Sequence, residues 1–162
     1  MKKTSFKRLG ALAMSLIMCF ALAVSASAKS GTNVTIYKEN GTDISMADDI
    51  VAGNATISVD GDTTTVVIPI QPIVGYAPMS FLPKADGYLR SLTVTGASSA
   101  VVSPDSGFDT SATLTIVMPT DSMPSDGRFA VTTSHIDLYK TGTTDAYTFM
   151  DHVSPSFIIA IG

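Results

Sequence analysis

The sequence contains no tryptophan, one cysteine, two histidines and only ten lysines and arginines. One cysteine cannot form an intramolecular disulfide, so the chain must be stabilised by a buried core. The catalytic patterns that spacing can reveal are also lacking: a Gly-x-Ser-x-Gly elbow, a His-Glu-x-x-His pair and a glycine-rich phosphate loop do not occur. Amphipathic helical periodicity is almost absent. Together these absences argue against an enzyme and against a helical protein.

The first 28 residues have the organisation of a secretory signal peptide. Four cations lie within residues 2–8, an apolar run covers 9–24, and Ala-Ser-Ala at 26–28 offers the small residues that cleavage needs. Cys19 follows a leucine by three residues, but Met18 occupies a position where a lipidation motif requires a small side chain. We therefore predict cleavage after Ala28, secretion of a single domain of residues 29–162, and no membrane association after cleavage.

Cleavage changes the charge of the chain. It removes four cations and the cysteine, and leaves six lysines and arginines against fourteen acidic residues, a net charge of −8. A surface with so few cations cannot neutralise many phosphates. Nucleic acid and anionic membranes are therefore excluded as expected partners.

The mature chain alternates apolar and polar residues over short segments that are separated by turn residues. This period of two is typical of half-buried strands. Asp60-Gly61 is predicted to form a tight hairpin turn, and Pro69 and Pro72 indicate that the strand before them lies at a sheet edge or leaves the sheet. The predicted strands cover residues 33–38, 55–59, 63–70, 88–95, 100–103, 111–118, 129–139 and 156–161, with one short helix at 45–51 and an apolar loop at 72–86. About eight short strands predict an antiparallel sandwich or a partly open barrel.

Two further expectations concern packing. Ile57 and Tyr88 are predicted to lie in the core. In the strand that begins at Tyr88, Leu89 is out of phase with Leu92 and Val94, so the alternation there is imperfect.

Three segments, taken in order, resemble the NEAT (near iron transporter) domain of Gram-positive surface and secreted haem-uptake proteins. They are Asn-Gly-Thr-Asp-Ile-Ser-Met-Ala at 40–47, Asn-Ala-Thr-Ile-Ser-Val-Asp-Gly-Asp at 54–62, and Tyr-Leu-Arg-Ser-Leu-Thr-Val at 88–94. The resemblance implies an Ig-like antiparallel β-sandwich with one short helix after the first strand. It also implies capture of haem or porphyrin for iron acquisition, with other haem-relay or surface proteins as possible partners.

The resemblance assigns roles to residues of the short helix. Ser45 matches the serine that hydrogen-bonds a haem propionate, and Met46 matches a side chain that packs over the porphyrin. Ile50 stands where the family usually has an aromatic residue. A hydroxyl at a helix start and a polarizable thioether suit these two roles.

The iron ligand is harder to assign, because the family's Tyr-x-x-x-Tyr pattern has no counterpart in the last predicted strand. Its nearest counterpart is His135 with Tyr139, which share one face of an extended strand. Either residue could ligate iron, and Tyr139 is our predicted metal ligand. Tyr147 and His152 are further candidates.

Each of these residues also has a purely structural interpretation. Ser45 can cap the helix, with Asp48 as its capping-box partner, and Met46 and Ile50 can bury one face of the turn. His135 and Tyr139 can be hydrogen-bonded packing residues of a strand. The alternative hypothesis is therefore an extracellular β-sandwich that binds protein or glycan, or is structural, and has lost haem binding.

Overall fold

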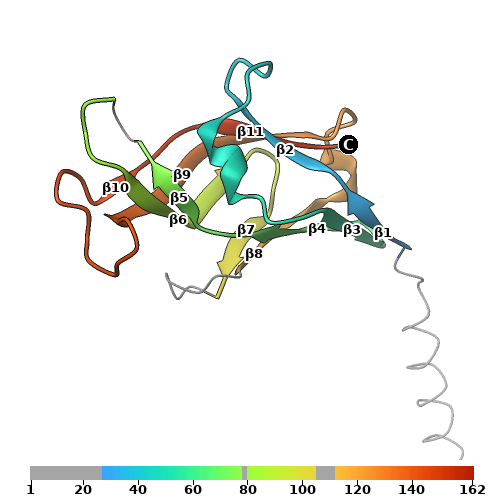
Figure 1. Ribbon diagram of the computed structural model, residues 1–162. Helices are drawn as coiled ribbons and strands as arrows, with labels where there is room; N and C mark the ends of the chain where they lie inside the picture. Colours follow the sequence, from blue (N-terminus) through green and yellow to red (C-terminus); the bar gives the residue numbers. More distant parts are fainter. Residues whose placement is uncertain (1–26, 78–79, 105–111) are drawn as a thin grey trace, which may run out of the picture.

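A computed structural model describes residues 27–77, 80–104 and 112–162, so nearly all of the predicted signal peptide lies outside the described residues. Two antiparallel β-sheets pack face to face (Figure 1). A short helix at residues 46–50 contributes Ala47 and Ile50 to the core between them. The predicted Ig-like β-sandwich is confirmed. Within the described ranges, no helix is long and apolar enough to cross a membrane.

The two sheets draw their strands from the whole length of the described chain. The first has the order β1-β3-β4-β8-β7, and the second has the order β2-β11-β9-β6-β5, with β10 paired to β9. Their bounds are β1 Ser27–Thr32, β2 Val34–Lys38, β3 Ala55–Asp60, β4 Thr63–Ile70, β5 Ile73–Tyr76, β6 Ala85–Val94, β7 Ser99–Ser103, β8 Ala112–Pro119, β9 Arg128–Lys140, β10 His152–Val153 and β11 Phe157–Ile161; the 3-10 helices are η1 Met46–Ile50 and η2 Thr120–Ser122.

Strand β1 was not predicted, because its first residues were assigned to the signal peptide. It pairs with β3, and the chain then crosses at Asn33 into β2 of the other sheet. Ser27 and Ala28 pair with Val59 and Ser58. Cleavage after Ala28 would therefore leave residues 29–32 as the edge strand.

The hairpin between β3 and β4 is present, but its turn is displaced by one residue from the predicted position. Asp60 pairs with Thr63, so the two loop residues are Gly61 and Asp62. Gly61 has φ of 55°, and no non-glycine residue among those described has positive φ. A positive φ at the first loop residue alone is the type II′ arrangement, which requires glycine there.

The prediction that the end of β4 lies at a sheet edge or leaves the sheet holds at Pro69 itself, although β4 as a whole is a central strand, because β3 does not extend as far as Pro69. Pro69 belongs to the central strand β4 and pairs with Thr113 of β8. Its carbonyl oxygen accepts a hydrogen bond from the Ala52 N–H at 2.9 Å, on the side where β3 has not yet begun. The N and O atoms of one residue in an antiparallel strand point to the same side. The side on which Pro69 lacks an N–H is therefore the side without a neighbouring strand at this position.

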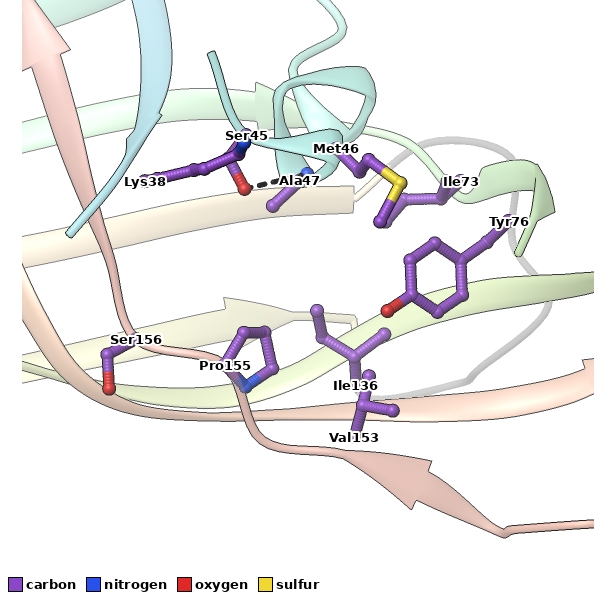
Figure 2. A pocket seen from close by; sticks show the side chains of 10 residues that line it. All are labelled: Lys38, Ser45, Met46, Ala47, Ile73, Tyr76, Ile136, Val153, Pro155 and Ser156. Carbon is purple, nitrogen blue, oxygen red and sulfur yellow. Dashed lines mark hydrogen bonds between the residues drawn. The ribbon is translucent and has the colours of Figure 1, made fainter. Parts of the chain in front are cut away.

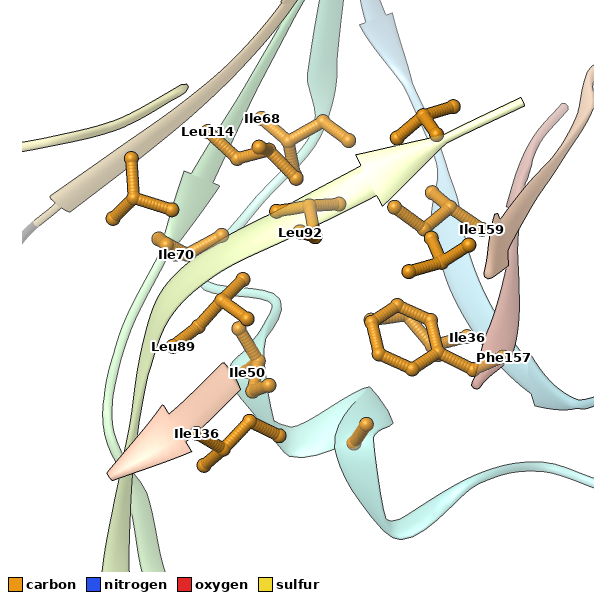
Figure 3. Packing of buried hydrophobic residues seen from close by; sticks show 14 of the residues in the cluster. Ile36, Ile50, Ile68, Ile70, Leu89, Leu92, Leu114, Ile136, Phe157 and Ile159 are labelled. Atoms are coloured by element: carbon orange, nitrogen blue, oxygen red, sulfur yellow. The ribbon is translucent and has the colours of Figure 1, made fainter. Parts of the chain in front are cut away.

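The core lies between the sheets and is built from the inward-facing residues of both (Figure 3). Ile68 and Leu114 come from the first sheet, and Phe157 and Ile159 from the second. The core predictions for Ile57 and Tyr88 are wrong: Ile57 is only partly buried against the core, and Tyr88 packs edge-on against Tyr139.

The imperfect phase of the strand that starts near Tyr88 has a structural cause. Leu89 pairs with Ile136, but Ser91 pairs with His135, so Arg90 is an extra residue in β6. This β-bulge lets Leu89 and Leu92 both face the core. A second bulge, at Thr132 of β9, restores the original register at Val94 and Val131.

Candidate functional site

A groove of about 230 Å³ opens at one end of the sandwich, between η1 and the second sheet (Figure 2). Seven of its lining residues are Met46, Ala47, Ile73, Tyr76, Ile136, Val153 and Pro155, and the other three are Lys38, Ser45 and Ser156. Ile136 is inward-facing and forms part of the floor. The groove is therefore a recess at the rim of the hydrophobic core.

Helix η1 is held in place by polar contacts at its start. The Ser45 hydroxyl accepts a hydrogen bond from the Ala47 N–H at 3.2 Å, which is the predicted N-cap. The capping-box prediction for Asp48 is wrong: the carboxylate of Asp48 instead accepts a hydrogen bond from the Ile36 N–H at 2.6 Å. This contact ties η1 to strand β2 and fixes the upper wall of the groove.

Met46 and Ile50 lie on different sides of η1, so the prediction that they bury one common face is wrong. Met46 is 58% exposed and lines the groove, whereas Ile50 is 1% exposed and lies in the core. The tighter winding of a 3-10 helix explains the difference, since residues three apart, not four, eclipse each other. Ile50 therefore anchors the helix while Met46 faces outward.

The groove has a polar end and an apolar end. At the polar end, Lys38 carries a cation that is loosely paired with the exposed Asp43 at 3.7 Å. The Ser45 oxygen already accepts a bond from Ala47, which leaves its O–H free to donate. The Ser156 hydroxyl donates to the Thr132 carbonyl at 2.9 Å. Lys38 and Ser45 are therefore the groups at this end that can donate to an anion.

Tyr76 lies at the apolar end and was missed as a site residue. The sequence placed it in an apolar loop, whereas residues 73–76 form β5 beside β6. Its ring is half-buried and its phenol oxygen points into the groove, toward Ile136 (Figure 2). Burial raises the pKa of the Tyr76 phenol, so the neutral form is favoured.

His135 and Tyr139 share one face of β9, as predicted, together with Asp137. The Asp137 carboxylate receives hydrogen bonds from Arg90 Nε at 2.5 Å and from the Tyr139 hydroxyl at 3.2 Å. The His135 Nε2 lies 2.8 Å from its other oxygen, and Arg90 also donates to Tyr139 at 3.0 Å. We call Arg90, His135, Asp137 and Tyr139 the outer cluster.

The outer cluster shifts the ionisation of its carboxylate. Burial alone would raise the pKa of Asp137, but the hydrogen bonds from Arg90, His135 and Tyr139 and the charge of Arg90 together lower it below its usual value. Burial likewise opposes the charge of Arg90, yet contacts with Asp137 and Tyr139 raise the pKa of the guanidinium. The cluster is thus a charged and mutually satisfied network.

The structure brings Ser45 and Met46 together in the groove and places His135 and Tyr139 on the opposite face of the second sheet. Successive residues of a strand point to opposite faces, and Ile136, between them in sequence, lines the groove. The ligand roles of Ile50, His135 and Tyr139 stay predictions.

The two further candidates are also held by neighbours. The His152 ring stacks on His135 with centroids 4.4 Å apart, which fixes β10 beside β9. Tyr147 is 5% exposed and its hydroxyl donates to the Pro83 carbonyl. No group of three or more histidine, cysteine, aspartate or glutamate residues within the described ranges is arranged to hold a metal ion.

Comparisons with known proteins identify the fold. No family model matches the sequence, and no curated protein matches it. The structure is similar to the NEAT5 domain of IsdX2, a B. anthracis hemophore in complex with heme, with a TM-score of 0.55. The alignment covers 85% of this chain and 97% of that domain, at 10% sequence identity. The chain has a NEAT-like fold. At 10% sequence identity, the similarity to the NEAT5 domain concerns the fold alone.

Proposed function

We propose that this chain is a secreted, non-catalytic module that captures haem or a related porphyrin in the groove beside η1. The observation that carries the proposal is the division of the groove into an apolar end and a donor-bearing end. A porphyrin with propionates has the same division, because its ring is flat and apolar and its carboxylates lie along one edge. The NEAT-like fold supports the proposal, since the similar IsdX2 domain is described as a hemophore in complex with heme.

The residues of the groove fit such a molecule. The Ser45 O–H and the Lys38 ammonium are donors for a carboxylate, and charge-assisted hydrogen bonds of this kind are stronger than neutral ones. The exposed thioether of Met46 is a polarizable surface for an aromatic ring. Ile50 would act from below, by holding η1 against the core. When bound, haem would supply the iron, which the groove itself does not provide.

The size of the groove predicts partial enclosure. Pockets that bury most of a small molecule usually measure roughly 300–1,000 Å³, and this groove measures about 230 Å³. A porphyrin would therefore insert along part of its ring and leave the rest in solvent. Such exposure suits a protein that takes up a ligand and passes it on. Secretion follows in this proposal from the leader in residues 1–28.

Titration of the purified mature chain with hemin tests the proposal. We expect a sharpened and shifted Soret band, with an affinity that Met46→Ala lowers by about tenfold, corresponding to about 1.4 kcal/mol. Val101→Ala is a matched control, because Val101 is 54% exposed but belongs to the first sheet. A flat hemin titration of a folded wild-type chain would exclude the proposal. Equal losses in Met46→Ala and Val101→Ala would place the ligand elsewhere.

A further inference from the structure

The groove holds two side chains with atoms that can ligate haem iron. They are the thioether of Met46 and the phenol of Tyr76, both known as axial ligand types. Met46 projects from η1, whereas Tyr76 projects from β5 (Figure 2). The two potential ligands therefore come from different elements that line the same recess.

The Tyr76 hydroxyl differs from those of Tyr139 and Tyr147. It has no hydrogen-bond partner among the residues that the structure describes, although burial favours partnered polar groups. By contrast, Tyr139 is bonded to Arg90 and Asp137, and Tyr147 to the Pro83 carbonyl. The phenol of Tyr76 is therefore available to a ligand in the groove.

The backbone of β5 turns Tyr76 into the groove. Residues three apart in a regular strand point to opposite faces, yet Ile73 and Tyr76 both line the recess. The pairing with β6 shifts between them, and Gly75 has φ of 71°, a conformation that favours glycine. A bulge of this kind re-aims the side chain that follows it.

A buried carboxylate holds this bulge in place. Asp86 is 7% exposed, and it accepts hydrogen bonds from the Gly75 N–H at 2.9 Å and from the Gly142 N–H at 2.8 Å. It thereby joins β5 to the loop that follows β9. The direction of Tyr76 is thus fixed by a conformation that the surrounding structure stabilises.

We infer that Tyr76 is the protein ligand of ferric haem iron in the groove. The inference rests on the proposed function. On binding, the phenol O–H bond breaks, its proton passes to solvent, and an iron–oxygen bond forms, so that a phenolate coordinates Fe(III). Coordination to Fe(III) replaces the proton on the phenol oxygen, as metal binding does at other protonated ligands. Tyr139, on the opposite face, is the competing ligand.

The test compares hemin with metal-free protoporphyrin IX as probes, for wild type, Tyr76→Phe and Tyr139→Phe. Tyr76→Phe should lower hemin affinity by at least about tenfold and abolish the phenolate-to-iron charge-transfer band. It should leave protoporphyrin affinity unchanged, because only the ligating oxygen is removed. Tyr139→Phe should retain both the band and the hemin affinity. Circular dichroism checks that each variant is folded.

A second variant guards against an indirect effect of Tyr76→Phe. Tyr76→His restores a ligating atom and should recover iron-dependent affinity with a different absorption spectrum. Loss of the band in Tyr139→Phe, or its persistence in Tyr76→Phe, would overturn the inference while leaving porphyrin capture intact. A wild-type chain that binds neither probe would overturn the proposed function and the inference together.

Discussion

The two faces of the second sheet carry polar groups in different states. On the outer face, Arg90, His135, Asp137 and Tyr139 bond to one another. On the inner face, at the rim of the core, β5 presents the Tyr76 phenol, which has no hydrogen-bond partner among the described residues. Helix η1 and its N-cap add an exposed thioether and a hydroxyl donor to the same groove. A group that is already bonded must lose a partner before it binds a ligand, whereas an unbonded one gains a partner.

This contrast separates a site from a structural network that shares the same residue types. Tyrosine and a polar partner occur on both faces, so residue identity alone does not distinguish them. The bonding state of each group does. On this criterion the groove is suited to binding, and the outer cluster is suited to holding β6 against β9. Three predictions measure how far the two regions differ.

The largest expected effect is on the side of η1 that the groove does not use. Ile50→Ala removes a side chain that is 1% exposed, and such truncations cost about 2–4 kcal/mol in free energy of unfolding. Met46→Ala, on the exposed side of the same helix, should cost less than about 0.5 kcal/mol. Chemical denaturation monitored by circular dichroism measures both. Equal costs would show that η1 is not divided between core and groove.

The second effect concerns the outer cluster and depends on pH. Asp137→Asn should lower the free energy of unfolding at pH 7 by about 1–2 kcal/mol, because Arg90 and Tyr139 lose a charged acceptor. The pKa of Asp137 is lowered in the folded state. Its contribution is therefore present above the unfolded pKa of about 4 and is lost as the pH falls through the folded pKa.

Denaturation series from pH 7 down to about pH 2 test this dependence. The difference between wild type and Asp137→Asn should shrink on acidification, starting near the unfolded carboxyl pKa of about 4. Hemin affinity at pH 7 should be the same in both proteins, since the cluster faces away from the groove. A difference in affinity would connect the two faces.

The smallest expected effect tests the polar end of the groove. Ser45→Ala removes a helix cap and should cost about 0.5–1 kcal/mol in stability. It also removes a donor for a carboxylate, so hemin affinity should fall by a few fold. Ser156→Ala is the comparison variant, because the Ser156 hydroxyl is occupied by the Thr132 carbonyl. Isothermal titration with hemin measures the two, and a larger loss in Ser156→Ala would reverse the assignment of the donor.

Much of the sandwich could be predicted from alternation. Residues 63–70 form a strand with the predicted bounds, and the long strand around 129–139 is present as β9. Strand β5 could not be found in this way, because it has four residues, lies close to two prolines and contains a glycine bulge. The sequence also did not show that Pro69 belongs to a central strand. A proline is tolerated there only because β3 does not extend beside it, and the extent of a neighbouring strand is not visible in the alternation.

Of the residues predicted to bind a ligand, Ser45 and Met46 line the candidate groove, and the reason that His135 and Tyr139 do not lies in β9. His135 and Tyr139 do share a face, but Ile136 and Leu138 between them are apolar and buried. That pattern already indicates that the odd-numbered residues point outward, away from the core that η1 covers. Tyr76 left no comparable signal, since its direction depends on the bulge at Gly75 and on the carboxylate of Asp86.

The paired bulges of β6 and β9 have a consequence for how these strands can change in length. The extra residue at Arg90 and the one at Thr132 offset each other, so the ladder has the same register before the first and after the second. Deletion of Arg90 alone, or of Thr132 alone, would remove an unpaired residue and leave the pairs on either side of it unchanged. Deletion of a paired residue would instead shift every pair beyond it and turn core side chains toward solvent. Single deletions in these strands should therefore be tolerated at the two bulges and nowhere else between them.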